Sequence, residues 1–149
     1  TNQLAYQLRI DERVCVMEQT NFKDTVIENF DPLPEVISID VSFTSIVPIL
    51  RHIKSLFKDE IEIAALIKPQ FESYLEERED SGIITNPDTH YQVIQRVLKE
   101  CGLLGLNPAA VDRSPITGTK GNIEYLFYLT GSETEYALTD KDIKTVVYG

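Results

Sequence analysis

The chain has 149 residues, of which 42% are hydrophobic, 26% charged and 9% aromatic. This length and composition are typical of one globular domain, which can bury roughly 70% of the surface of the unfolded chain. Acidic residues outnumber basic ones by 24 to 14, which gives a net charge of −10. This charge argues against a nucleic-acid-binding surface, because such a surface needs clustered cations.

Cysteine content and hydropathy indicate the class of compartment. Cys15 and Cys101 are too few for a disulfide framework or a cysteine-only zinc site, so we expect a reducing compartment and no metal site. No apolar run approaches the ~20 residues that cross a bilayer, and the first residues show no export signal. These features predict a cytoplasmic protein that does not bind membranes.

The first half of the chain alternates between helical and strand patterns. Apolar residues at helical spacing predict a helix over residues 1–9 and another that starts at Thr44 or Ser45 and runs to Phe57. Short apolar runs bounded by charged or turn residues predict buried strands. These strands cover residues 14–17, 36–41 and 61–67.

The next segment is a polar loop followed by a well-marked helix. Residues 70–85 are polar and acidic and predict a loop or a weak helix. Asn86 is a favourable N-cap, Pro87 suits the first helical position, and Gly102 is expected to end the helix. His90 falls at the start of this helix with no accompanying set of His or Cys ligands, so we assign it a structural role.

The end of the chain carries two more strands, roughly 103–112 and 123–129, which are close enough to form a hairpin. Residues 131–149 are rich in Thr, Asp, Glu and Lys and predict surface structure. Strands buried on both faces and alternating with helices are typical of a parallel sheet in a doubly wound α/β fold. We expect the hairpin to add an antiparallel edge to that sheet.

Polar residues stand at the ends of the predicted strands, where open α/β sheets bind their ligands. The blocks that carry them are TNF, DVSF, KPQFE and SPITGTKGNIE, and their polar residues include Asn21, Asp40, Lys68 and Glu124. Taken singly, Asp40 could cap the next helix, Lys68 could be a solvated lysine and the SPITGTKGN loop a simple hairpin connection. Glu124 inside an apolar strand is unexpected unless it is paired.

The DVSF, KPQFE and SPITGTKGNIE blocks, together and in this order, resemble the FtsJ-like S-adenosylmethionine-dependent RNA methyltransferases, and within them the TlyA (haemolysin A) branch. The likeness covers residues 1–130, a partial FtsJ-like methyltransferase domain, and leaves 131–149 as a C-terminal tail. It implies a Rossmann-like sheet, parallel with a final antiparallel strand, that lacks its first strands in this chain. It also implies S-adenosylmethionine-dependent methylation of ribose 2′-hydroxyls in ribosomal RNA.

The family uses a Lys-Asp-Lys-Glu tetrad, and the resemblance assigns its last three members to Asp40, Lys68 and Glu124. Asn21 and Phe22 match the position that meets the adenine of the cofactor, and Asp40 would lie beside its methyl-bearing end. Methyl transfer to a hydroxyl needs an oxygen in line with the methyl and a base for its proton. Lys68 would be that base, oriented by the two acids.

Several features of the family have no counterpart here, namely the first lysine, the Gly-rich turn and the small N-terminal RNA-binding domain. Lys68 is left beside two acids, which predicts that it stays protonated and that this chain, a truncated fragment, is inactive alone. The expected partners are ribosomal RNA or ribosomal subunits, largely through the missing domain. A non-catalytic RNA-binding module and a cytolysin remain as alternatives, although no amphipathic or apolar membrane segment supports the latter.

Overall fold

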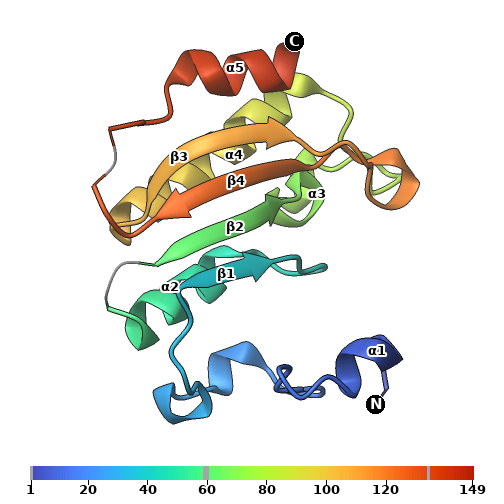
Figure 1. Ribbon diagram of the computed structural model, residues 1–149. Helices are drawn as coiled ribbons and strands as arrows, with labels where there is room; N and C mark the ends of the chain where they lie inside the picture. Colours follow the sequence, from blue (N-terminus) through green and yellow to red (C-terminus); the bar gives the residue numbers. More distant parts are fainter. Residues whose placement is uncertain (1, 59–60, 134) are drawn as a thin grey trace.

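The computed structural model describes residues 2–58, 61–133 and 135–149. Its four strands are β1 (Val36–Ile39), β2 (Glu62–Ile67), β3 (Asn107–Arg113) and β4 (Tyr125–Thr130). They form one sheet in the order β1-β2-β4-β3 (Figure 1). β1 pairs with β2 in parallel, and β4 pairs with β2 and β3 in antiparallel fashion. The predicted α/β class and the antiparallel final strand are confirmed.

The hairpin differs from the expectation in its place in the sheet. β4 lies between β2 and β3, so that β3, and not the last strand, forms the edge. β4 is suited to the interior because its alternate residues Tyr125, Phe127 and Leu129 are apolar or aromatic and no more than 2% exposed. The sequence predicts the hairpin from its short loop but not which of its strands joins the rest of the sheet.

The α-helices of the described residues are α1 (Tyr6–Arg9), α2 (Val47–Leu56), α3 (Pro69–Glu72), α4 (Pro87–Leu103) and α5 (Asp140–Tyr148). The start of α4 confirms the sequence prediction, since the Asn86 side chain accepts a hydrogen bond from the backbone N–H of Asp88 at 2.9 Å. Within the described ranges, no helix is long and apolar enough to cross a membrane.

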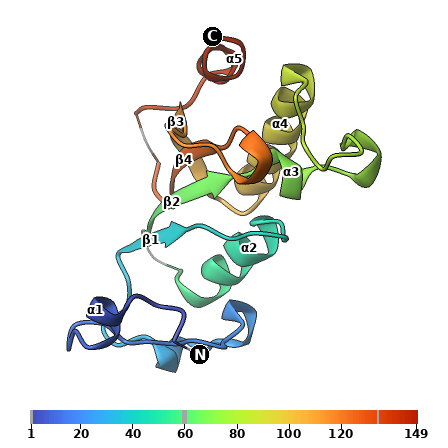
Figure 2. The ribbon, with the colours of Figure 1, turned by 90° about the vertical axis from the view of Figure 1, so that its right-hand side faces the viewer.

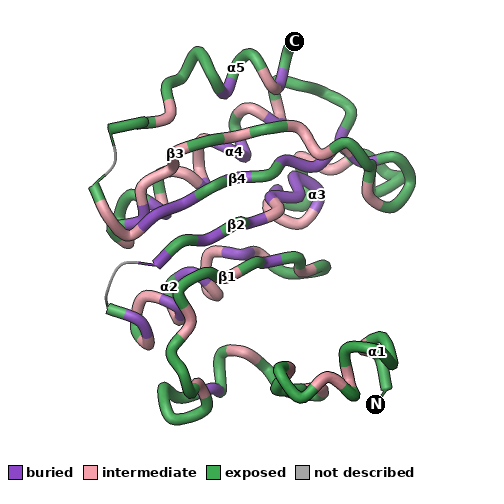
Figure 3. The backbone as a smooth tube through the Cα atoms, viewed as in Figure 1, coloured by how far each residue is buried: buried purple, intermediate pink, exposed green. Residues whose placement is uncertain are grey.

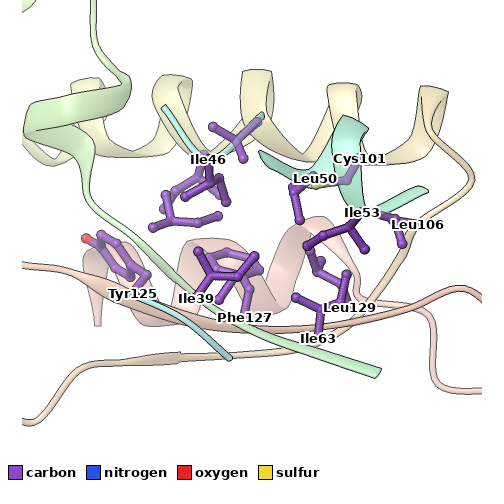
Figure 4. Close-up of a cluster of buried hydrophobic side chains, with 14 of the residues drawn as sticks. Ile39, Ile46, Leu50, Ile53, Ile63, Cys101, Leu106, Tyr125, Phe127 and Leu129 are labelled. Atoms are coloured by element: carbon purple, nitrogen blue, oxygen red, sulfur yellow. The ribbon is translucent and has the colours of Figure 1, made fainter. Parts of the chain in front are cut away.

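α2 and α4 lie over the same face of the sheet (Figure 2). The core fills the space between these helices and the strands, with Leu50 and Ile53 from α2 and Ile63 from β2 among its fully buried side chains (Figure 4). Burial of such side chains supplies most of the favourable free energy of folding. This layer therefore fixes the strand ends from which the polar residues emerge.

The opposite face of β1, β2 and β4 carries no helix of the described chain (Figure 2). Ser38, Ala64 and Tyr128 are neighbours in register on this face, and all three are exposed. The prediction that the strands are buried on both faces is therefore wrong for the described residues. Sheets with parallel strands are ordinarily covered on both faces, and here one covering layer is present.

The N-terminal segment, residues 2–20, lies apart from the sheet and is largely exposed (Figures 1 and 3). The strand predicted over residues 14–17 is wrong, because the segment pairs with no strand and Cys15, Val16 and Met17 are exposed. The helix predicted over residues 1–9 is reduced to the single turn of α1, which buries no residue. An apolar run becomes a strand only where a partner satisfies its backbone, and the described chain offers none.

The C-terminal segment adds to the core, although its composition predicted surface structure. Ile143 and Val147 of α5 are buried against the main cluster. The guanidinium of Arg113 on β3 donates hydrogen bonds to the carbonyl oxygens of Val146 and Val147 at 2.8 and 2.9 Å. A cation at the C-terminus of a helix satisfies carbonyls that lack helical partners, so the edge strand holds α5 in place.

His90 links α4 to β4. Its Nε2 lies 2.7 Å from the carbonyl oxygen of Ile84 and therefore donates, and its Nδ1 lies 2.8 Å from the hydroxyl of Tyr125 and therefore accepts. The residue is 2% exposed, and burial lowers the pKa of its imidazole below the ordinary value. These contacts agree with the structural role predicted for His90.

The protonation of His90 predicts a pH-dependent stability. Because the pKa of His90 is lowered in the folded protein, the contribution of the neutral imidazole to stability is complete above the unfolded value of about 6.5. It is lost as the pH falls from that value through the lower pKa of the folded protein. We expect urea unfolding to show His90→Gln destabilised by about 1–3 kcal/mol at pH 7.5, with a smaller loss of stability than wild type between about pH 7 and 5. Equal slopes for wild type and His90→Gln would contradict the prediction.

Candidate functional site

The strand register brings the predicted catalytic residues to one edge of the sheet. Ile67 of β2 pairs with Tyr125 of β4, so the next residues outward, Lys68 and Glu124, leave the sheet side by side. Asp40 directly follows β1, the parallel neighbour of β2. The site thus lies at the carboxyl ends of the two parallel strands, where open α/β sheets bind ligands.

Lys68 and Asp40 form an ion pair, with 2.7 Å between Lys68 Nζ and Asp40 Oδ1. Nζ also donates a hydrogen bond to Ser42 Oγ at 3.2 Å. The Lys68 side chain is only 10% exposed, whereas that of Asp40 is 73% exposed. A cation on a buried stem therefore meets a carboxylate that faces solvent and remains open to a ligand.

Glu124 is 5% exposed and pairs with an amide instead of the lysine. Its Oε1 accepts a hydrogen bond from Gln70 Nε2 at 3.0 Å. Among the residues that the structure describes, no ion pair joins Glu124 to Lys68. Gly118 packs directly on this carboxylate, since a Cβ at position 118 would lie 2.1 Å from Glu124 Oε1. The glycine is needed here for close approach and not for its backbone freedom.

A cavity of about 350 Å³ opens beside Gln70 and is lined by aromatic and cationic side chains. The Phe43 and Phe71 rings line it with their centroids 4.9 Å apart, together with Arg78 and Lys120. Phe43 is 89% exposed and has a φ of 62°, a left-handed conformation that is uncommon outside glycine. Strained backbone and an exposed aromatic ring at a cavity are typical of ligand-binding sites.

Asn21 and Phe22 have local roles in the structure. Asn21 Oδ1 accepts a hydrogen bond from the backbone N–H of Lys23 at 3.1 Å and caps a short 3₁₀ turn. The Phe22 ring packs edge-on against His52, with centroids 5.2 Å apart. Within the described ranges neither residue bonds to Asp40. Their contact with adenine stays a prediction.

The site also contains neutral residues that lie beside the predicted charged ones. Ser42, Phe43, Gln70 and Phe71 all belong to the DVSF and KPQFE blocks, so the signal for them was present. Lys120, from the hairpin loop, had no signal of its own. Its place in the cavity follows from the fold, because its Nζ donates to the carbonyl oxygen of Ser81 at 2.6 Å and joins two loops.

The relationship of this chain to known proteins agrees with this geometry. A sequence profile of the FtsJ-like methyltransferases matches residues 1–130. The chain belongs to the FtsJ-like methyltransferase family. It is 42% identical over 129 residues to YqxC of Bacillus subtilis, which is named as an rRNA methyltransferase, with 86% of this chain and 46% of YqxC covered.

A second relative places the chain near the TlyA branch. It is 30% identical over 146 residues to the protein of Mycobacterium tuberculosis named 16S/23S rRNA (cytidine-2′-O)-methyltransferase TlyA, with 98% of this chain and 54% of TlyA covered. The predicted resemblance to the TlyA and FtsJ-like proteins is therefore confirmed. The chain spans about half the length of these relatives.

The fold is also similar to that of a solved structure. The chain superposes on a protein from Streptococcus thermophilus described as a hemolysin with a TM-score of 0.92 and 38% sequence identity. The match covers 99% of this chain and 54% of the solved chain. This similarity confirms the predicted α/β fold class.

The packing of Gly118 predicts a large effect of a single methyl group. Gly118→Ala would force Glu124 away from Gln70, because the new Cβ and Glu124 Oε1 cannot lie 2.1 Å apart. We expect the substitution to lower the free energy of unfolding by about 1–3 kcal/mol in denaturant titrations. Gly102→Ala is the matched control, since nothing lies within 4 Å of its Cβ position. Similar stabilities for the two variants would contradict the packing role of Gly118.

Proposed function

We propose that this chain forms part of the catalytic domain of an S-adenosylmethionine-dependent methyltransferase that modifies ribose 2′-hydroxyls of ribosomal RNA. The Asp40–Lys68 ion pair, at 2.7 Å on the ligand-binding edge of the sheet, is the observation that carries this proposal. The names of YqxC and of the tuberculosis TlyA protein support the reaction class. Their family is one that generally depends on S-adenosylmethionine.

The residues at the sheet edge fit this cofactor and reaction. S-adenosylmethionine, when bound, supplies an electrophilic methyl group on a cationic sulfur, and the exposed carboxylate of Asp40 suits a cation. Asn21, Phe22 and Asp40 would hold the cofactor. Lys68 Nζ would accept the proton of the ribose hydroxyl, with Asp40 and Ser42 orienting Nζ through the contacts described above.

The target nucleotide would enter the cavity lined by Phe43 and Phe71. Exposed aromatic rings stack on bases whatever their sequence, and cations attract phosphates. Arg78 and Lys120 supply positive charge at the cavity, in a chain whose net charge is −10. These two cations would contact the phosphates on either side of the bound base. Gln70, which lines the cavity and hydrogen-bonds Glu124, would form the wall nearest the reacting ribose.

This chain spans about half the length of its relatives, and an additional segment like the rest of those relatives would complete the enzyme. The uncovered face that includes Ser38, Ala64 and Tyr128 supports this part of the proposal, because another layer would bury it. A cation from that additional segment beside Lys68 would favour loss of its proton. Because the first lysine of the tetrad has no counterpart in the 149-residue chain, we expect this chain alone to transfer no methyl groups.

The proposal predicts that methyl transfer depends on Lys68. The full-length protein is incubated with labelled S-adenosylmethionine and unmethylated ribosomal subunits, beside variants whose folding is confirmed by circular dichroism. Lys68→Ala should lower the rate of label transfer at least ~100-fold, since it removes the base. Lys141→Ala, an exposed lysine on α5, is the control and should retain activity.

The outcomes separate the competing functions. Equal transfer by wild type and Lys68→Ala would remove Lys68 from the chemistry. No transfer by wild type, with the cofactor bound, would favour the non-catalytic RNA-binding module.

The cavity predicts a separate effect on RNA binding. Phe43→Ala should raise KM for the RNA about 10- to 100-fold with a small change in KM for the cofactor, because one base loses its stacking partner. Leu103→Ala, an equally simple truncation of a side chain that is 73% exposed at the end of α4, should change neither constant. A Phe43→Ala enzyme with unchanged KM for RNA would show that the base binds elsewhere.

A further inference from the structure

The N-terminus of α2 is capped by a residue from another part of the chain. Its N-cap residue is Ile46, whose side chain cannot accept a hydrogen bond. The backbone N–H of Ile46 donates instead to Glu72 Oε1 at 2.7 Å, while the neighbouring Ser45 Oγ accepts from the backbone N–H of Val47 at 3.1 Å. A negative charge is favoured at this end of a helix by the helix dipole.

Glu72 lies one helical turn after Lys68. It is the last residue of α3, and its backbone N–H donates to the carbonyl oxygen of Lys68 at 3.1 Å. The loop of residues 40–46 is therefore held at both of its ends by the same turn of chain. Lys68 Nζ contacts the start of the loop at Asp40 and Ser42, and the Glu72 carboxylate contacts its end.

The loop held in this way carries much of the candidate site. Asp40 and Ser42 contact Lys68, and Phe43 lines the cavity with a left-handed backbone. Burial raises the pKa of Glu72, and the hydrogen bonds from Ser45 and Ile46 act in the opposite direction. A carboxylate is costly to bury unless it is well hydrogen-bonded. The hydrogen bonds from the loop therefore offset the free-energy cost of burying Glu72.

We propose that Glu72 is a positioning residue, which holds residues 40–46 in the conformation that brings Asp40 and Ser42 to Lys68. Glu72 touches neither reactant and acts only through this loop. The inference deepens the proposed function and rests on it for the kinetic part of its test. A purely structural role for Glu72 would lower stability but leave the geometry of the Asp40–Lys68 pair unchanged.

The test compares Glu72→Ala with Glu72→Gln in the full-length protein. The amide of Gln retains an oxygen that can accept from the Ile46 N–H, whereas Ala retains none. We expect Glu72→Ala to lower kcat about 100-fold, because small displacements of reacting groups are costly, with both KM values changed less than about threefold. Glu72→Gln should stay within about fivefold of wild type.

Glu77→Ala is the matched control. This substitution removes the ion pair between Glu77 Oε2 and Arg96 Nη2, which lie 2.6 Å apart. In the described structure Glu77 has no contact with the 40–46 loop. It should therefore lower stability and leave kcat unchanged. Equal kcat values for wild type and Glu72→Ala, or equal losses in Glu72→Ala and Glu72→Gln, would overturn the positioning role.

A double-mutant cycle gives a readout that does not need activity. The coupling between Asp40→Asn and Lys68→Met in urea unfolding is measured with Glu72 present and in the Glu72→Ala background. Positioning predicts that the coupling disappears in Glu72→Ala and is retained in Glu77→Ala. A coupling that survives in Glu72→Ala would overturn the inference. If wild type transfers no methyl groups, the proposed function fails and the cycle alone decides the role of Glu72.

Discussion

The pairing of β2 with strands on both of its sides is the constraint on which the site depends. β1 runs parallel to β2, so Asp40 and Lys68 leave the sheet at the same edge, and β4 runs antiparallel to it, so Glu124 enters the sheet there. A slip of one residue would turn each side chain to the other face. The buried residues Ile63 and Phe127 resist such a slip, because it would expose them to water.

Around this edge, one loop and one turn depend on each other. The loop of residues 40–46 is tied to the turn that begins at Lys68 by the Asp40 ion pair at one end and by Glu72 at the other. Gln70, between these two ties, hydrogen-bonds Glu124. Because Lys68, Gln70 and Glu72 of the KPQFE block all make contacts at the same edge, a change in one contact is expected to reach the others.

The start of α4 and the strands β1 and β2 were predicted from local patterns, whereas the place of the final hairpin in the sheet was not. The start of α4 at Pro87 follows from Asn86, a cap that acts within its own turn. The strand expected over residues 14–17 did not form because a strand needs a second chain segment to bond its backbone, and no described segment pairs with this run. The place of β4 inside the sheet likewise depends on β2, which lies far from it in the sequence.

By itself, the sequence determined the class of fold, the family and the types of residue that stand at the strand ends, since these follow from hydrophobic period and motif order. The tertiary structure decided which of those residues meet. It paired Lys68 with Asp40, gave Glu124 an amide partner in Gln70 and supplied the cap of α2 from Glu72. These contacts join residues that are distant along the chain, so no local propensity encodes them, and only the packing of the sheet and its helices brings them within bonding distance.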